Sequence, residues 1–247
     1  MPHTRDIGIF DLETTGVTPE TDRIVTAFVG RLSPDGTVIS GQEWLIAPDG
    51  FVIPEAAANV HGITTEQALA EGRPFAEVLP EIIAALADLA DDGVPVSAHN
   101  ASYDFTMLAF EMARLGHPDP VRFIDGIDII DTFILDKQLD RFRRGKRTLT
   151  AIAPLYGVTL TDEEAHGAAA DAIAAGRVAI VMLRNGELAH LSIEDLYRLQ
   201  RGWARSQRAS FIEFRRNKGD ADFDVDMGWP LYSTASVLAV PEEVYTF

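Results

Sequence analysis

Two acidic side chains, Asp11 and Glu13, end an apolar run that begins at Ile7 and leads into a glycine at Gly16. The run predicts a β-strand, in which residues two apart point to the same face. Two neighbouring carboxylates repel each other, and burial strengthens the repulsion unless a cation lies between them. The pair therefore indicates half of a site for a hard metal ion. Considered alone, the pair more readily indicates a turn acid beside a solvated acid at a strand end, and the rest of the chain decides between the two interpretations.

Two later segments carry acids that suit the same kind of site. Asp104 follows a strand-like segment and lies in the first turn of a predicted helix, where the helix dipole alone would favour an acid. Asp171 lies among alanines in a predicted helix over 168–184, and such small neighbours allow another group to come close. His166 would be about 140° away on a continuous helix, so we expect it in the preceding loop, within reach of the same centre.

These three motifs resemble, in their order and spacing, the DEDDh 3'-5' exonucleases, also called DnaQ-like. The family includes the proofreading epsilon subunit of bacterial DNA polymerase III, and the resemblance covers about residues 5 to 184. A segment from Val60 to Thr64 also matches an epsilon-like motif. The sister subtype has a tyrosine at the place of Gly167, so the histidine subtype is indicated.

The resemblance implies a role for eleven residues and a two-metal hydrolysis. The carboxylates that would hold two ions are Asp11, Glu13, Asp104 and Asp171, and the general base would be His166. All-oxygen ligation favours Mg²⁺ or Mn²⁺ over Zn²⁺. The residues expected to contact the terminal nucleotide are Thr14, Thr15, Gly16, His61, Asn100 and Tyr103, and for Tyr103 a packing role is an equal alternative.

The predicted elements give an α/β protein. Strand-like segments at 6–13, 23–32 and 37–46 come first, the last two joined by a turn at 33–36, and alternating helices and strands follow. The resemblance implies a ribonuclease-H-like fold, a mixed sheet of five strands flanked by helices. We expect an exonuclease domain over residues 1–185 and a C-terminal extension over 186–247.

Positive charge is concentrated in two segments of an otherwise acidic chain. The net charge is −17 over 247 residues, which by itself argues against a polyanionic partner. Residues 137–147 nevertheless sum to +5 and residues 192–218 to +4. The second segment predicts a basic amphipathic helix, with Arg201, Arg205 and Arg208 on an outward face and Trp203, Phe211 and Phe214 on a docked face.

The leading hypothesis is a metal-dependent 3'-to-5' exonuclease that releases nucleoside 5'-monophosphates from single-stranded DNA. The alternatives are an RNA 3'-end trimming enzyme of the same family and a non-catalytic module that binds nucleic acid or a polymerase. Association with a DNA polymerase is a further partnership that the resemblance raises. No run is apolar enough for a membrane span and the chain has no cysteine, so we expect a cytoplasmic protein without a membrane partner.

Overall fold

Three long strands near the N-terminus form an antiparallel meander in the computed structural model, which describes residues 5–160 and 167–238. They are β1 (Ile7–Thr14), β2 (Ile24–Leu32) and β3 (Val38–Ala47). The predicted turn at 33–36 joins β2 to β3, and Ser33 N donates to Thr37 O at 2.9 Å. Gly36 takes φ 87°, a left-handed conformation that glycine adopts without strain.

The complete sheet is mixed, with the strand order β4-β3-β2-β1-β5-β6. β5 (Val96–Ala98) runs parallel to β1, and β6 (Ile129–Asp131) runs parallel to β5. The five expected strands are therefore present. The sixth, β4 (Arg73–Pro74), pairs with the end of β3 and is too short to give a periodic signal in the sequence.

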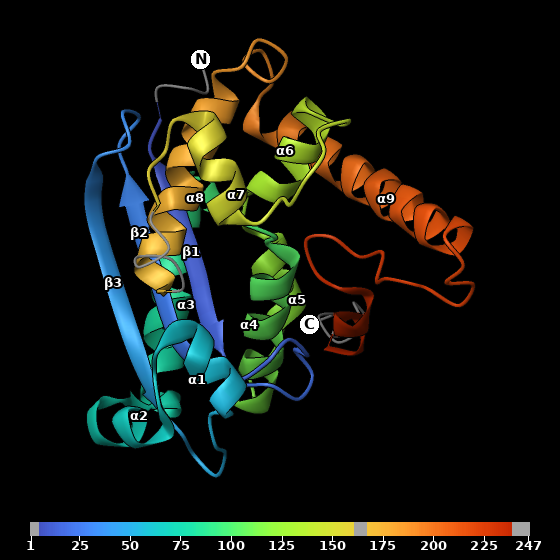
Figure 1. Cartoon of the computed structure of the whole chain (residues 1–247). Coiled ribbons are helices and arrows are strands. Elements are labelled where there is room, and N and C mark those ends of the chain that lie inside the picture. Colours follow the sequence, from blue (N-terminus) through green and yellow to red (C-terminus); the bar gives the residue numbers. More distant parts are fainter. Residues whose placement is uncertain (1–4, 161–166, 239–247) are drawn as a thin grey trace, which may run out of the picture.

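Helices cover both faces of this sheet (Figure 1). In the first 185 residues they include α2 (Thr65–Glu71), α3 (Phe75–Asp91), α4 (Ser102–Arg114), α6 (Thr132–Leu139) and α8 (Ala168–Leu183). The helical segment that follows the basic loop divides into α7 (Leu149–Ile152) and the 3₁₀ helix η2 (Ala153–Tyr156). Two short helices were not predicted, α1 (Glu55–His61) and α5 (Pro120–Asp125), because neither is long enough to show an apolar stripe.

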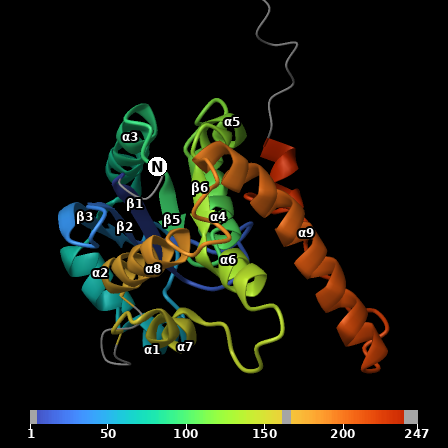
Figure 2. The ribbon, with the colours of Figure 1, turned by 90° about the horizontal axis from the view of Figure 1, so that it is seen from above.

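The core has two main parts, one on each face of the sheet. Phe10 and Leu12 of β1 pack with α3 and α4 on one face, while Ile7 and Ile9 pack with α8 on the other. Figure 2 shows α3 and α8 on opposite sides of the long strands. The alternation of β1 therefore assigns Asp11 and Glu13 to the α8 face.

The C-terminal extension shares the core of the rest of the chain. α9 (Ile193–Asn217) packs on α6 and β6 through its first half, where Leu196 and Ala204 are buried. Beyond that, Figure 1 shows α9 passing α6 and the following segment returning toward α4 and α5, where the 3₁₀ helix η3 (Ser233–Leu238) packs. Within the described ranges, no helix is both long and apolar enough to span a membrane.

The sequence-based division of α9 into a docked and an outward face is wrong over its second half. Phe211 and Phe214 are 40% and 55% exposed, because α9 extends past the body of the protein there. Arg208 instead turns inward and donates to Ser102 Oγ at 2.9 Å and to the carbonyl of Gly228.

Candidate active site

Three predicted metal-binding acids meet where β1 passes the start of α8. Carboxylate oxygens of Asp11, Glu13 and Asp171 all lie within 4.8 Å of one another. Further along α8 the helix packs closely on the sheet: a Cβ on Gly176 would lie 2.7 Å from Leu32 Cδ1 and would also collide with Ile9.

Asp104 reaches the same region from the first turn of α4. Its side chain is buried, with an exposed fraction of 3%. Burial raises the pKa of its carboxyl group, and the negative charges of Asp131 and Glu13 raise it further. The backbone N–H of Leu12, between Asp11 and Glu13 in β1, partly offsets this increase. Asp104 thus lies beside the other acids.

The electrostatics of this cluster favour a bound cation. Burial raises the pKa of Asp11, and the charges of Asp104, Glu13 and Asp171 add to the effect. Burial together with Asp171 and Glu43 raises the pKa of Glu13 to about 8. Carboxylates that repel one another in a buried site are stabilised by a divalent cation, and hard oxygen donors suit Mg²⁺ or Mn²⁺. The residues present therefore fit the metal ions that the sequence implies.

The predicted general base, His166, lies in the segment 161–166, outside the residues that the structure describes. The next residue, Gly167, is the N-cap of α8, so the described part of the chain resumes at the helix that carries Asp171. The assignment of His166 as general base remains a prediction from the sequence.

The residues after β1 form a hydrogen-bonded turn beside the acids. Thr14 Oγ1 donates to Gly16 O at 2.8 Å and also lies 2.5 Å from the hydroxyl of Tyr103, which donates to the same carbonyl. Thr15 Oγ1 accepts from Arg23 N at 2.9 Å and donates to Asp22. In this structure the hydroxyls of Thr14, Thr15 and Tyr103 stabilise the turn, which favours the packing alternative for Tyr103.

Two further predicted substrate residues approach the end of β1 from different elements. Asn100 lies between β5 and α4 in a left-handed conformation, φ 65°, and its backbone N–H donates to Asp131 Oδ1 at 3.1 Å. His61 ends α1, where Nδ1 accepts from Ile63 N at 3.2 Å. Partial burial lowers the pKa of His61, and the nearby backbone of Thr14 opposes this shift. His61 is therefore next to the turn that follows β1.

A cavity of about 510 Å³ opens beside the acids. Asp11, Asp171 and Asn100 contribute to its lining, and so do Lys146 and Arg147 from the loop between α6 and α7. The sequence did not assign these two cations to the site, although the local charge of +5 over residues 137–147 was a signal of their importance.

A buried carboxylate, Asp136 of α6, holds the basic loop in place. It forms ion pairs with Arg143 and Arg147 and accepts from the hydroxyl of Tyr156 at 3.0 Å. The carbonyl of Arg147 lies 2.9 Å from His99 Nε2, so that nitrogen carries the proton. Burial lowers the pKa of His99 to about 4, so the ring stays neutral at pH 7.

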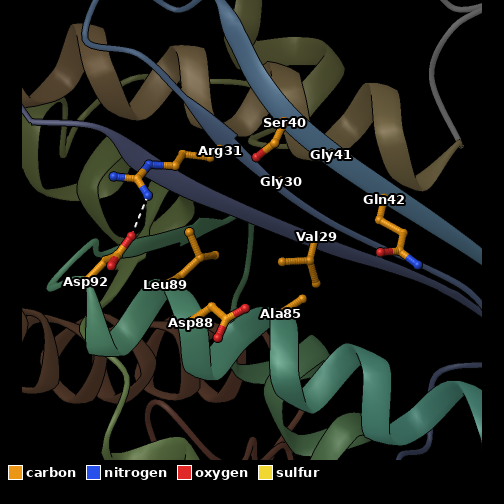
Figure 3. A pocket seen from close by; sticks show the side chains of 10 residues that line it. All are labelled: Val29, Gly30, Arg31, Ser40, Gly41, Gln42, Ala85, Asp88, Leu89 and Asp92. Atoms are coloured by element: carbon orange, nitrogen blue, oxygen red, sulfur yellow. Dashed lines mark hydrogen bonds and ion pairs between the residues drawn. The ribbon is translucent and has the colours of Figure 1, made fainter.

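Another hollow, of about 280 Å³, lies on the opposite face of the sheet between α3 and strands β2 and β3 (Figure 3). Its charged pair, Arg31 and Asp92, is already joined by an ion pair at 2.6 Å. Asp11 and Glu13 point away from this face, so the hollow takes no part in the acidic site.

Comparison with known proteins gives several related sequences and structures. Residues 9–179 match the model of a family described as exonuclease. The chain is 29% identical over 184 residues to a DNA polymerase III subunit epsilon-like protein of Rhodobacter capsulatus, a match that covers 71% of this chain and 23% of the relative. It is 32% identical over 168 residues to DNA polymerase III PolC-type of Lacticaseibacillus paracasei, covering 68% of this chain and 10% of that protein.

The fold is similar to that of exonuclease I. One such structure has a TM-score of 0.63 at 19% identity, over 87% of this chain and 45% of the other. E. coli exonuclease I in complex with a dA16 oligonucleotide has a TM-score of 0.61 at 20% identity, over 74% of this chain and 42% of the other. This chain thus spans less than a quarter of these two curated relatives and less than half of these structural neighbours. Since the family model matches well over half of the chain, this protein belongs to the DnaQ-like family of exonucleases.

Proposed function

We propose that the protein removes nucleoside 5'-monophosphates from the 3' end of single-stranded DNA. The observation that supports this most directly is the convergence of Asp11, Glu13 and Asp171 within 4.8 Å, with buried Asp104 beside them. Four acids, of which Asp11, Glu13 and Asp104 have raised pKa values, suit a reaction that needs divalent cations and a negatively charged substrate.

Asp11, Glu13, Asp104 and Asp171 would hold two Mg²⁺ or Mn²⁺ ions. When bound, such ions lower the pKa of a water molecule and stabilise the charge that develops on a leaving oxygen. His166 would accept the proton of the attacking water, because an imidazole of ordinary pKa is neutral in a large fraction of molecules at pH 7. Lys146 and Arg147, which line the same cavity, would add positive charge near the incoming phosphates.

The preference for single-stranded DNA rests on the relatives. Their names refer to DNA polymerase III, and one structural neighbour is bound to a DNA oligonucleotide. Discrimination from RNA depends on contacts with the 2'-hydroxyl. We place the activity in the cytoplasm, and association with a DNA polymerase is a second part of the proposal that the names of the relatives support.

The test is to incubate the protein with 5'-labelled single-stranded DNA, duplex DNA and RNA of one sequence, with Mg²⁺, Mn²⁺ or EDTA. We expect a ladder of products shortened from the 3' end of single-stranded DNA only when a metal ion is present. Asp11→Ala should reduce the rate by at least about a thousandfold, as expected when several kcal/mol of charge stabilisation is lost. His166→Ala should reduce it strongly, with partial recovery as the pH rises.

Asp162→Ala, in the same segment as His166, is a suitable control because neither the motifs nor the described site assigns it a role. Faster shortening of RNA than of DNA would favour the exoribonuclease alternative. An Asp11→Ala variant that cuts as fast as the parent would exclude this catalytic centre. Binding of strands without shortening under any condition would support the non-catalytic alternative.

A further inference from the structure

We propose that the C-terminal extension and α6 form a groove that binds the nucleotides immediately 5' of the terminal one. This inference deepens the proposed function and rests on it for the orientation of the strand. The occupant is a single strand of nucleic acid, whose phosphates would contact the cations of the groove and whose bases would stack on its aromatic rings.

The first argument is continuity with the acidic site. The groove has a volume of about 540 Å³ and adjoins the cavity that contains Asp11 and Asp171. Asn100, Phe133 and Arg147 line both spaces. A strand whose 3' end lies at the acids can therefore continue past these three residues into the groove.

The second argument is the positive charge. Lys137, Arg147 and Arg208 come from three separate segments and all line the groove. Burial lowers the pKa of Lys137, and the charges of Arg147 and Arg208 lower it further. Cations that repel one another in a half-buried groove are stabilised by an anion such as a phosphate group.

Among the described residues that line the groove, the acidic one is Asp226. Its carboxylate accepts hydrogen bonds from the backbone of its own segment, from Gly228 N at 2.7 Å and from Ser233 N at 2.8 Å. It therefore shapes the wall that carries Tyr232. Arg147 and Arg208 are held by Asp136 and by Ser102 and Gly228, while Lys137 forms no ion pair among the described residues and can meet a phosphate.

The third argument is the placement of aromatic rings beside these cations. Lys137 Nζ lies 4.9 Å from the ring centre of Phe133 and 6.0 Å from that of Phe211. The exposed ring of Phe211 is supported from behind by Phe223, with ring centres 5.2 Å apart. Cations interleaved with supported, accessible rings are the arrangement that binds single-stranded nucleic acid without sequence preference.

The experiment compares two double variants on α6 and α9. Lys137→Gln with Phe211→Ala removes one cation and one ring from the groove. Lys218→Gln with Phe214→Ala removes a similar pair, 5.9 Å apart, that does not line it. Binding of 5'-fluorescent oligothymidylates of two and ten nucleotides is measured by anisotropy in EDTA, so that hydrolysis does not enter the result.

We expect the parent to bind the ten-nucleotide strand more tightly than the dinucleotide. In the groove variant, the ratio of the affinity for the ten-nucleotide strand to that for the dinucleotide should fall about tenfold, the size expected for one stacked base. The control variant should keep the ratio of the parent. In the parent, a photoreactive 5-iodouracil placed third or fourth from the 3' end should cross-link to the peptide that contains Phe211 or Tyr232.

Failure of this inference differs from failure of the proposed function. If the parent shortens strands but the two double variants bind the long strand equally, or the cross-link falls outside the groove, the groove is excluded and the activity stands. If the groove variant alone loses the length dependence but no strand is shortened with Mg²⁺ or Mn²⁺, the groove stands and the activity is excluded.

Discussion

The indole Nε1 of Trp229 donates a hydrogen bond to Asp131 Oδ2 at 3.1 Å. The other oxygen of the same carboxylate accepts from the backbone of Asn100 at 3.1 Å and of Phe133 at 3.0 Å. Asp131 therefore connects the C-terminal extension to the turn that presents Asn100 to the acidic cavity. A change in the extension should therefore alter the position of Asn100 through Asp131.

Replacement of Trp229 by phenylalanine tests this connection. Trp229→Phe keeps a ring against Tyr197, whose centre lies 5.1 Å away, and removes the donor to Asp131. Loss of a hydrogen bond to a buried carboxylate should lower the free energy of unfolding by about 1–3 kcal/mol in urea titrations. Trp203→Phe is the control, because its indole N–H makes no hydrogen bond among the described residues. Equal losses in the two variants would contradict the role of the hydrogen bond.

Gln200 of α9 completes the hydrogen bonding of the edge strand β6. Its amide donates to Ile129 O and accepts from Asp131 N, both at 2.8 Å, with no exposed surface. Gln200→Leu leaves two buried backbone groups without partners, so the free energy of unfolding should fall by about 2–4 kcal/mol. Gln207→Leu removes a single bond, to Ile134 O, and should cost about half as much. Urea denaturation of both variants gives the comparison.

The raised pKa of Glu13 predicts an unusual dependence of stability on pH in EDTA. Its carboxyl group has a pKa of about 8 in the folded chain against an ordinary value of 4.5, so between these values only the folded state keeps the proton. The free energy of unfolding should therefore decrease as the pH rises from 5 to 8, by about 1.4 kcal/mol per pH unit from this group.

Addition of Mg²⁺ should remove this decrease, because a metal ion binds the deprotonated carboxylates and the folded state more strongly at high pH. Glu13→Gln should show a smaller slope in EDTA. Chemical denaturation at several pH values measures both effects. A slope that is the same in parent and Glu13→Gln would show that Glu13 is not the group responsible.

His61 provides a test of the substrate contacts beside β1. Because Nδ1 accepts from Ile63 N, the proton of the neutral ring is on Nε2, and this N–H lies near the backbone of Thr14 without an acceptor in full hydrogen-bond geometry among the described residues. If it donates to the substrate, His61→Ala should raise KM about tenfold or more and change kcat less. His61→Gln retains an N–H donor and should recover part of the loss. A change in kcat alone would assign His61 a different role.

The sequence predicted the acidic cluster better than its surroundings. Asp11, Glu13, Asp104 and Asp171 are predictable because adjacent or isolated acids in apolar segments need a specific reason, and the structure brings them together. The inward turn of Arg208 was not predictable, because helical periodicity states which residues share a face and not which face lies against a neighbour. The half-exposed rings of Phe211 and Phe214 illustrate the same limit, since α9 is longer than the surface it packs on.

Asp136 forms ion pairs with Arg143 and Arg147. These two cations should therefore respond to ionic strength differently from the exposed cations of this protein. Ion pairs to a buried carboxylate are screened little by salt, whereas contacts between exposed cations and phosphates weaken as counterions compete for the strand. The loop beside the acids should therefore keep its shape at salt concentrations where the strand is held less tightly. Higher salt would then weaken the binding of a strand and leave the rate of hydrolysis of a bound strand nearly constant.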